Sequence, residues 1–212
     1  MPETGAQDQH GFHQGEREVQ ERFDSQRLAD RVAEFTHRDV ITESDRAYIE
    51  SRDMFFLATG DADGNMDCSY KGGLPGFIRV LDEQTLAFPI YDGNGKFQSS
   101  GNILVHGKVG MLFIDWDGQS RMRLNGSATI DFEDPLLADF PEAQFVVRVR
   151  AEQVFPNCPR YIHKMQLVER SANVPRTGCE TPDAEWKDHF DAELPADQRA
   201  RRAARQAEGA PR

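Results

Sequence analysis

Residues 54–131 decide the fold, and they read MFFLATGDADGNMDCSYKGGLPGFIRVLDEQTLAFPIYDGNGKFQSSGNILVHGKVGMLFIDWDGQSRMRLNGSATID. Short apolar runs alternate with turn signals, and the turns at 63–64, 92–93 and 117–118 are Asp-Gly pairs. The runs are Met54–Thr59, Phe77–Leu81, Thr85–Ile90, Val109–Asp115 and Met122–Ile130. Such spacing predicts an antiparallel meander, which usually closes into a small barrel. The sequence therefore predicts a mainly β fold with flanking helices.

One long connection, from Tyr91 to Lys108, interrupts the meander. It begins with a glycine-rich turn and continues with residues that favour a helix. Lys96, Ser99 and Asn102 are three residues apart, so a helix would place them on adjoining turns of one face. A glycine-rich turn leading into a helix can hold an anion. The alternative is a loop followed by a helix that only covers the barrel.

A family resemblance rests on several short motifs. They are CSYKGG at 68–73, PGFIRVLD at 75–82, DGNGK at 92–96, and Ser99 with Asn102-Ile103. The segment 109–115, followed by RLNG at 123–126, fits the same pattern. Over about residues 16–170 the chain resembles the pyridoxamine 5'-phosphate oxidase-like flavin-binding proteins, in a flavin-nucleotide-binding branch. Lys96 stands without an adjacent Arg or Lys, which departs from the vitamin B6 oxidase and argues against vitamin B6 oxidation.

The resemblance implies a split β-barrel that binds flavin mononucleotide (FMN) at the interface of a homodimer. The dianionic phosphate of FMN needs cations and backbone donors, and the flavin ring needs donors where negative charge appears on reduction. We expect Lys71, Lys96, Ser99 and Asn102 at the phosphate, with Asn94 shaping the loop and Ser69 beside them in the same motif. For the ring we expect the backbone around Arg79–Val80 and the side chains of Arg121 or Arg123. The flavin carries the electron chemistry, so no catalytic residue and no metal ligand is predicted.

Composition narrows the classes of function. The chain has 212 residues, enough for one full domain, and a net charge of -11, which argues against binding to nucleic acid or anionic membranes. No apolar run reaches membrane-spanning length, and the N-terminus shows no apolar signal region. Cys68, Cys158 and Cys179 are widely spaced and form no zinc-binding pattern. Reduced thiols in a cytoplasmic protein are the expectation.

We divide the chain into four segments. Residues 1–14 are expected to be a flexible N-terminus, 15–52 N-terminal helices packed on the barrel, 53–170 the flavin-binding split barrel, and 171–212 a C-terminal extension that is partly helical or disordered. Between Gly15 and Arg38 apolar residues recur at helical spacing, at Val19, Phe23, Leu28, Val32 and Phe35. They predict an amphipathic helix that packs on the barrel or on a partner subunit. Thr42 and Asp45 form a capping box for a short helix through Ser51.

Several alternatives stay open at this point. Arg79 lies in an apolar run and could face either the pocket or solvent. Cys158 could be a reactive thiol or belong to a structural turn with Pro159. The main functional hypothesis is an FMN-dependent oxidoreductase whose substrate is unknown. The alternatives are a non-catalytic flavin or haem carrier, a deazaflavin-dependent reductase, and a barrel that serves only as an interaction module.

Overall fold

A computed structural model describes residues 7–207 of the chain, and these residues fall into two compact units that divide between Gln166 and Leu167. Part of the expected flexible N-terminus, residues 1–6, and the end of the C-terminal extension, residues 208–212, lie outside the described residues. The first unit holds the β-sheet. Its helices are α1 (Gln14–Arg22), α2 (Gln26–Thr36), α3 (Glu43–Glu50), α4 (Gln98–Val105) and the 3-10 helix η1 (Pro135–Asp139).

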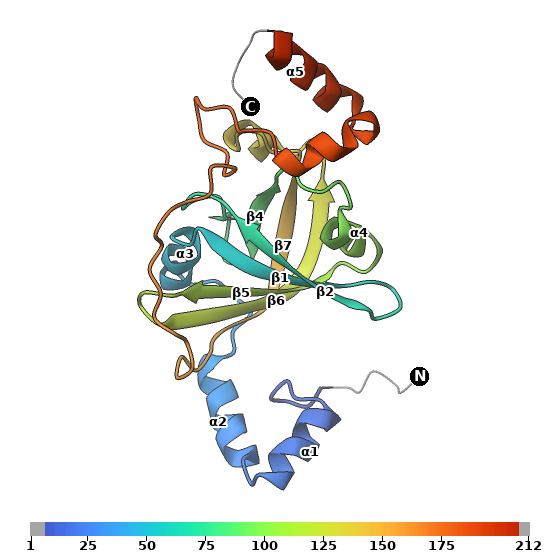
Figure 1. Ribbon diagram of the computed structural model, residues 1–212. Helices are drawn as coiled ribbons and strands as arrows, with labels where there is room; N and C mark the ends of the chain where they lie inside the picture. The colour runs from blue at the N-terminus through green and yellow to red at the C-terminus, as the bar shows by residue number, and fades with distance from the viewer. Residues whose placement is uncertain (1–6, 208–212) are drawn as a thin grey trace. The chain divides into compact units, whose positions relative to one another are not determined.

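The strands form one antiparallel sheet in the order β2-β1-β5-β6-β7-β4-β3 (Figure 1). They are β1 (Met54–Gly60), β2 (Met66–Gly72), β3 (Arg79–Val80), β4 (Thr85–Ile90), β5 (Lys108–Asp115), β6 (Ser120–Asp131) and β7 (Phe145–Pro156). The expected mainly β fold with flanking helices is confirmed. Along β6, Met122, Leu124 and Gly126 are buried while Arg123 and Asn125 are exposed, because successive side chains of a strand point to opposite faces.

The core shows that the sheet curls around one interior. Phe55 of β1 packs against Phe88 of β4 with ring centroids 5.0 Å apart, and against Phe113 of β5 at 5.6 Å. Strands β1 and β4 stand four places apart in the sheet order, so this contact crosses the interior. A β-bulge at Asn125/Gly126 helps β6 bend. A Cβ on Gly126 would lie 2.1 Å from the backbone oxygen of Arg150, so only glycine fits there.

Two expected elements differ from the structure. Strand β3 covers only Arg79–Val80, not Phe77–Leu81, because Phe77 and Ile78 turn into the core instead of pairing with β4. The expected helix over Gly15–Arg38 is a pair of helices, because Asp24 adopts a left-handed conformation with φ of 49° and reverses the chain. We call this pair, α1 and α2 with their connecting turn, the helical hairpin.

The start of α3 follows the sequence closely. Thr42 and Asp45 form the predicted capping box: the Asp45 amide donates to Thr42 Oγ1 at 3.2 Å, and the Thr42 amide donates to Asp45 Oδ2 at 2.9 Å. Asp45 is buried, and its carboxylate also forms an ion pair with Arg38 at 3.0 Å. This cap fixes α3 against the end of the barrel, with Ile49 fully buried beneath it.

The second unit, from Leu167, is described by itself. It contains the 3-10 helix η2 (Glu185–Glu193) and the helix α5 (Ala196–Ala207). Arginines of α5 pair with carboxylates of the same unit: Arg202 with Asp188, and Arg205 with Asp183 at 3.3 Å. Lys187 is buried and donates to Gln198 at 3.0 Å.

Candidate functional site

A cavity of about 220 Å³ lies between β2, the end of β4 and the loop that leads into α4. Its walls combine an edge strand with a glycine-rich loop, so they are mostly polar. The residues that line it are Asp67, Cys68, Ser69, Lys71, Ile90, Tyr91, Gly93, Asn94, Gly95, Lys96, Phe97, Gln98, Ser99 and Ser100.

Strand β2 supplies three of the polar side chains. Asp67, Ser69 and Lys71 alternate along the strand, so they share one face. Asp67, Ser69 and Lys71 pair with Thr59, Leu57 and Phe55 of β1, whose side chains are buried. The polar face of β2 therefore points to the interior side of the sheet, at the end where the cavity opens. The opposite face of β2 carries Cys68 and Tyr70, which are exposed.

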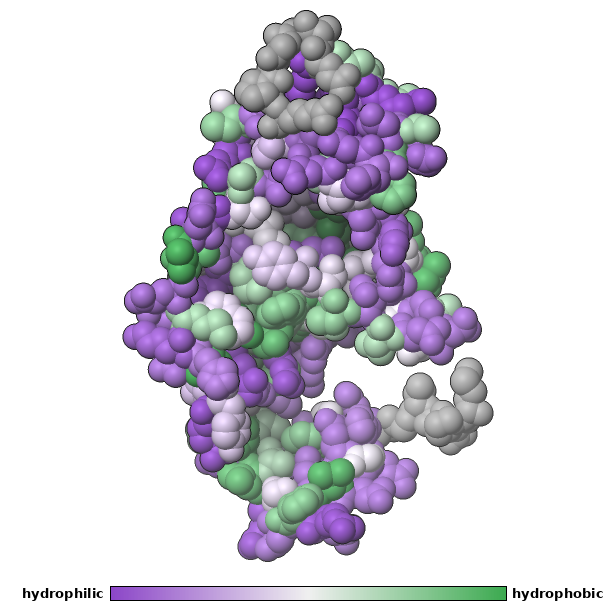
Figure 2. Space-filling model, viewed as in Figure 1, coloured by the Kyte–Doolittle hydropathy of each residue, from purple (hydrophilic) through white to green (hydrophobic). Residues whose placement is uncertain are grey.

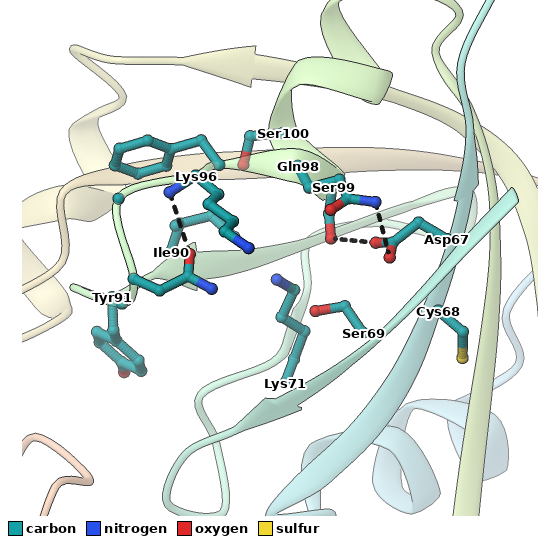
Figure 3. A pocket seen from close by; sticks show the side chains of 14 residues that line it. Asp67, Cys68, Ser69, Lys71, Ile90, Tyr91, Lys96, Gln98, Ser99 and Ser100 are labelled. Carbon is teal, nitrogen blue, oxygen red and sulfur yellow. Dashed lines mark hydrogen bonds between the residues drawn. The ribbon is translucent and has the colours of Figure 1, made fainter. Parts of the chain in front are cut away.

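Two lysines converge on this cavity. Figure 3 shows the side chain of Lys71, from the strand, and that of Lys96, from the loop, pointing into the same space. Within residues 7–207, neither ammonium group makes a hydrogen bond or an ion pair. Lys71 is half-buried, and burial lowers its pKa, although the nearby Asp67 carboxylate acts in the opposite direction. Two cations without partners at one cavity favour an anionic ligand.

The start of α4 adds further donors. Phe97 is the N-cap residue in a left-handed conformation with φ of 49°, and its side chain makes no capping hydrogen bond. The N–H groups of the first helical turn have no acceptor within a helix, and a helix N-terminus attracts negative charge. Ser99 is buried at this turn, and its Oγ donates to Asp67 Oδ2 at 3.2 Å. The Lys96 amide donates to Asn94 Oδ1 at 3.0 Å, which closes the loop.

The structure brings half of the predicted site residues together. Ser69, Lys71, Asn94, Lys96 and Ser99 line the cavity. Asn102 does not: it lies one turn further along α4, and its Nδ2 donates to the buried Thr59 Oγ1 at 3.0 Å. It holds α4 against β1 beside the cavity.

Arg79 and Val80 lie away from the cavity. Arg79 pairs with Asp139 at 2.6 Å and its guanidinium stacks over Phe140 at 4.8 Å, so the pocket-facing position is not observed. The amide of Val80 donates to Glu50 Oε1 at 2.9 Å, so this donor is already used within the chain. Both contacts count against a role for this segment at the flavin ring.

Arg121 and Arg123 occupy the outer face of the sheet. Arg123 lies in a row that crosses five strands, because directly paired residues of antiparallel strands share a face. We call it the outer row, and its members are Tyr70, Phe56, Leu112, Arg123 and Phe155. Asp67, Ser69 and Lys71 of β2 are on the opposite face, so one chain by itself cannot place these arginines and Lys71 on the same ligand.

Asp67 is the site residue that sequence reasoning missed. Its carboxylate accepts from both Ser99 and Gln98, each at 3.2 Å, and it ties β2 to α4 across the cavity. The signal was available, since Asp67 alternates with Ser69 and Lys71 at the period of a strand. Among residues 7–207, no cluster of His, Cys, Asp and Glu could hold a metal ion, no helix could span a membrane, and the three cysteines are free.

Comparisons with known proteins give one family. The model of the family described as pyridoxamine 5'-phosphate oxidase matches residues 41–172, a range that contains the whole sheet and the cavity. None of the curated proteins compared with the chain matches it.

Solved structures resemble the chain more loosely. A candidate pyridoxamine 5'-phosphate oxidase from Lactobacillus delbrueckii is 25% identical, covering 57% of this chain and 99% of its own, with a TM-score of 0.47. An FMN-binding protein from Syntrophomonas wolfei is 13% identical, covering 66% and 97%, with a TM-score of 0.43. HutZ, a haem storage protein from Vibrio cholerae, is 16% identical, covering 54% and 93%, with a TM-score of 0.41.

Proposed function

This chain belongs to the pyridoxamine 5'-phosphate oxidase family, and on that premise we propose that it is an FMN-binding oxidoreductase. Its antiparallel sheet with flanking helices is the split β-barrel that the family resemblance implies. The cavity between β2 and α4 is the proposed phosphate site. Its substrate and electron donor are left open.

The observation that carries the proposal is the pair of lysines at the cavity. A phosphate monoester carries nearly two negative charges at neutral pH, and Lys71 and Lys96 are two cations without partners in the described part of the chain. Charge-assisted hydrogen bonds from such groups contribute more than neutral ones. The Ser69 and Ser99 hydroxyls and the first turn of α4 add neutral donors at the same place.

The size of the cavity fits the phosphate end of the cofactor. Pockets for whole cofactors measure about 300–1,000 Å³, whereas this cavity measures about 220 Å³. We propose that a second copy of the chain completes the site around the flavin ring. The outer row on the sheet supports a homodimer, because Phe56 and Leu112 are only half-buried there and Arg123 is exposed.

The chemistry divides simply between cofactor and protein. When bound, FMN would supply the acceptance and donation of electrons. Lys71 and Lys96 would hold and orient the phosphate, and Asp67 would fix Ser99 at the start of α4. Arg121 or Arg123 from the partner would place positive charge near the ring. A flavin carrier without turnover uses the same residues, so turnover separates the two functions.

A haem carrier finds less support at this cavity. Haem iron is held by His, Cys, Met or Tyr ligands. Of these types, Cys68 and Tyr91 line the cavity, and Figure 3 shows both side chains turned away from the lysines. We also propose a cytoplasmic location, which fits three free and exposed thiols.

Spectroscopy of the purified protein tests the proposal. We expect a flavin absorption spectrum, and release of the ligand by denaturation should give the mass of FMN. A haem spectrum, or apo protein that fails to bind added FMN, would overturn the assignment. For the enzyme as opposed to the carrier, a panel of nicotinamide and other donors should bleach the bound flavin, and air or a quinone should restore it.

A further inference from the structure

The helical hairpin presents an apolar face that nothing in the described structure covers. Its five large apolar residues are exposed: Phe23 at 73%, Phe35 at 71%, Leu28 at 67%, Val19 at 59% and Val32 at 49%. No residue of α1 is buried, and in α2 only Ala33 is. Figure 2 shows these helices as a region where apolar residues gather on the surface. Exposed apolar patches of this size mark interaction sites.

An ion pair joins the two helices of the hairpin. Arg17 of α1 pairs with Asp30 of α2 at 2.7 Å and with Asp8 at 2.6 Å. Helices of 9 and 11 residues are marginal in water unless an amphipathic face is packed. The Arg17–Asp30 ion pair leaves the apolar residues of both helices exposed to solvent. A stable hairpin therefore requires that these residues pack on another protein surface.

We propose that this surface is the hairpin of a second copy of the chain, packed through α2. Leu28, Val32 and Phe35 follow one another at spacings of four and three residues, which makes a seam on one face of α2. Two such seams interdigitate around a two-fold axis when the helices run antiparallel. Val19 and Phe23, at the end of α1, extend the apolar surface beyond the seam, and the five exposed residues together offer on the order of 500 Å² per chain. A contact that includes both helices of each hairpin therefore reaches the roughly 1,000 Å² that a specific interface needs.

Charge favours this occupant over a membrane. Residues 14–36 carry four arginines and six carboxylates, whereas a helix that lies on an anionic bilayer needs a basic polar face. Within α2, Arg27 and Arg31 lie toward the start, and Glu34, which also pairs with Arg31 of its own helix at 2.9 Å, lies toward the end. Antiparallel packing places unlike charges of two copies beside each other, and it also opposes the two helix dipoles. Parallel packing would place like charges together.

The root of the hairpin joins the outer row of the sheet. His37, which ends α2, packs on Phe155 with ring centroids 4.7 Å apart, and Arg38 bridges to Val154. Phe155 is the last member of the row that contains Leu112 and Arg123. One two-fold axis can therefore relate both surfaces. The pairing goes beyond the proposed flavin site, because the hairpin contributes no residue to the cavity.

Cross-linking of the full chain tests the pairing. Cys68, Cys158 and Cys179 are exposed, so a Ser variant at all three gives a background without thiols. In it, Val32→Cys lies on the seam, and Gln26→Cys is the control on the other side of the same helix. At micromolar protein, a short bismaleimide should join two copies roughly tenfold or more faster at position 32 than at position 26, since pairing gives a millimolar effective concentration.

A charge placed on the seam tests whether the faster cross-linking depends on packing of the apolar residues. Leu28→Glu, added to the Val32→Cys protein, should abolish the difference, whereas Gln26→Glu, which adds the same charge outside the seam, should keep it. Equal rates at positions 32 and 26, or a difference that survives Leu28→Glu, would overturn the proposal. The cross-linking readout needs no cofactor. Protein that cross-links at position 32 but binds no FMN would therefore contradict the proposed function and leave the pairing of the hairpins supported.

Discussion

Lys71→Met is the substitution that most directly tests the proposed phosphate site. Lys71 is half-buried, faces the cavity and has no partner in the described part of the chain. A hydrogen bond to a charged group contributes about 1.5–3 kcal/mol, so the affinity for FMN should fall roughly 10- to 100-fold. Lys96 is exposed and more screened, so Lys96→Met should cost about 0.2–1 kcal/mol, which is less than about fivefold.

Riboflavin provides the internal reference, because it shares the ring and ribityl chain of FMN and lacks the phosphate. Titration of FMN and riboflavin into apo protein, followed by flavin fluorescence, gives both dissociation constants. Riboflavin affinity should hardly change in either variant. Lys164→Met is the matched control, since Lys164 is exposed and pairs with Asp117 at 3.4 Å, away from the cavity. Unchanged FMN binding in Lys71→Met, or equal losses for both ligands, would refute the phosphate assignment.

Three further outcomes are expected. Burial places the pKa of Lys71 below that of an ordinary lysine. FMN affinity should fall as pH rises through this pKa, because deprotonation removes the positive charge of Lys71. Riboflavin affinity should show no such step in the same titrations. Asp134→Asn should lower the free energy of unfolding by about 1–3 kcal/mol, since buried Asp134 binds Arg148 at 2.5 and 3.0 Å. Arg148 holds the pKa of Asp134 below its usual range, so the stability that the Asp134–Arg148 pair contributes is present above the ordinary carboxyl pKa and is lost as pH falls through the lowered value. If thermal melts of the parent and of Asp134→Asn differ equally at all pH values, this expectation is contradicted. The backbone N–H and guanidinium of Arg160 lower the pKa of exposed Cys158, so iodoacetamide at neutral pH should alkylate it before Cys68 and Cys179, and Arg160→Gln should slow it; peptide mass mapping over time gives the order.

Local patterns in the sequence determined much of the fold. Strands β1, β4, β5 and β6 follow apolar runs between turn residues, because alternation and turn chemistry act within a few residues. The capping box at Thr42 formed as predicted, since it joins groups three residues apart. The glycine-rich turn before α4 likewise placed Lys96 and Ser99 at one cavity.

The short range of those signals also sets their limit. Asp24 reverses the chain inside a segment whose apolar spacing predicts one helix, because a single left-handed residue leaves that spacing unchanged. Where the N-terminal helices pack depends on which apolar surfaces the rest of the fold leaves exposed. In the structure, the apolar face of the helical hairpin is exposed to solvent. Residue spacing alone cannot show that.

By itself, the sequence determined the antiparallel barrel, the helix after the glycine-rich turn and the basic character of the proposed phosphate site. Only the tertiary structure decided which polar groups meet. Arg79 pairs with Asp139, sixty residues away; Asp67 of strand β2 accepts a hydrogen bond from Ser99 of helix α4; and Arg123 lies on the face opposite Lys71. The physical reason is that ion pairs and cavities join residues distant along the chain, whereas periodicity reports only which side of its own element a residue occupies.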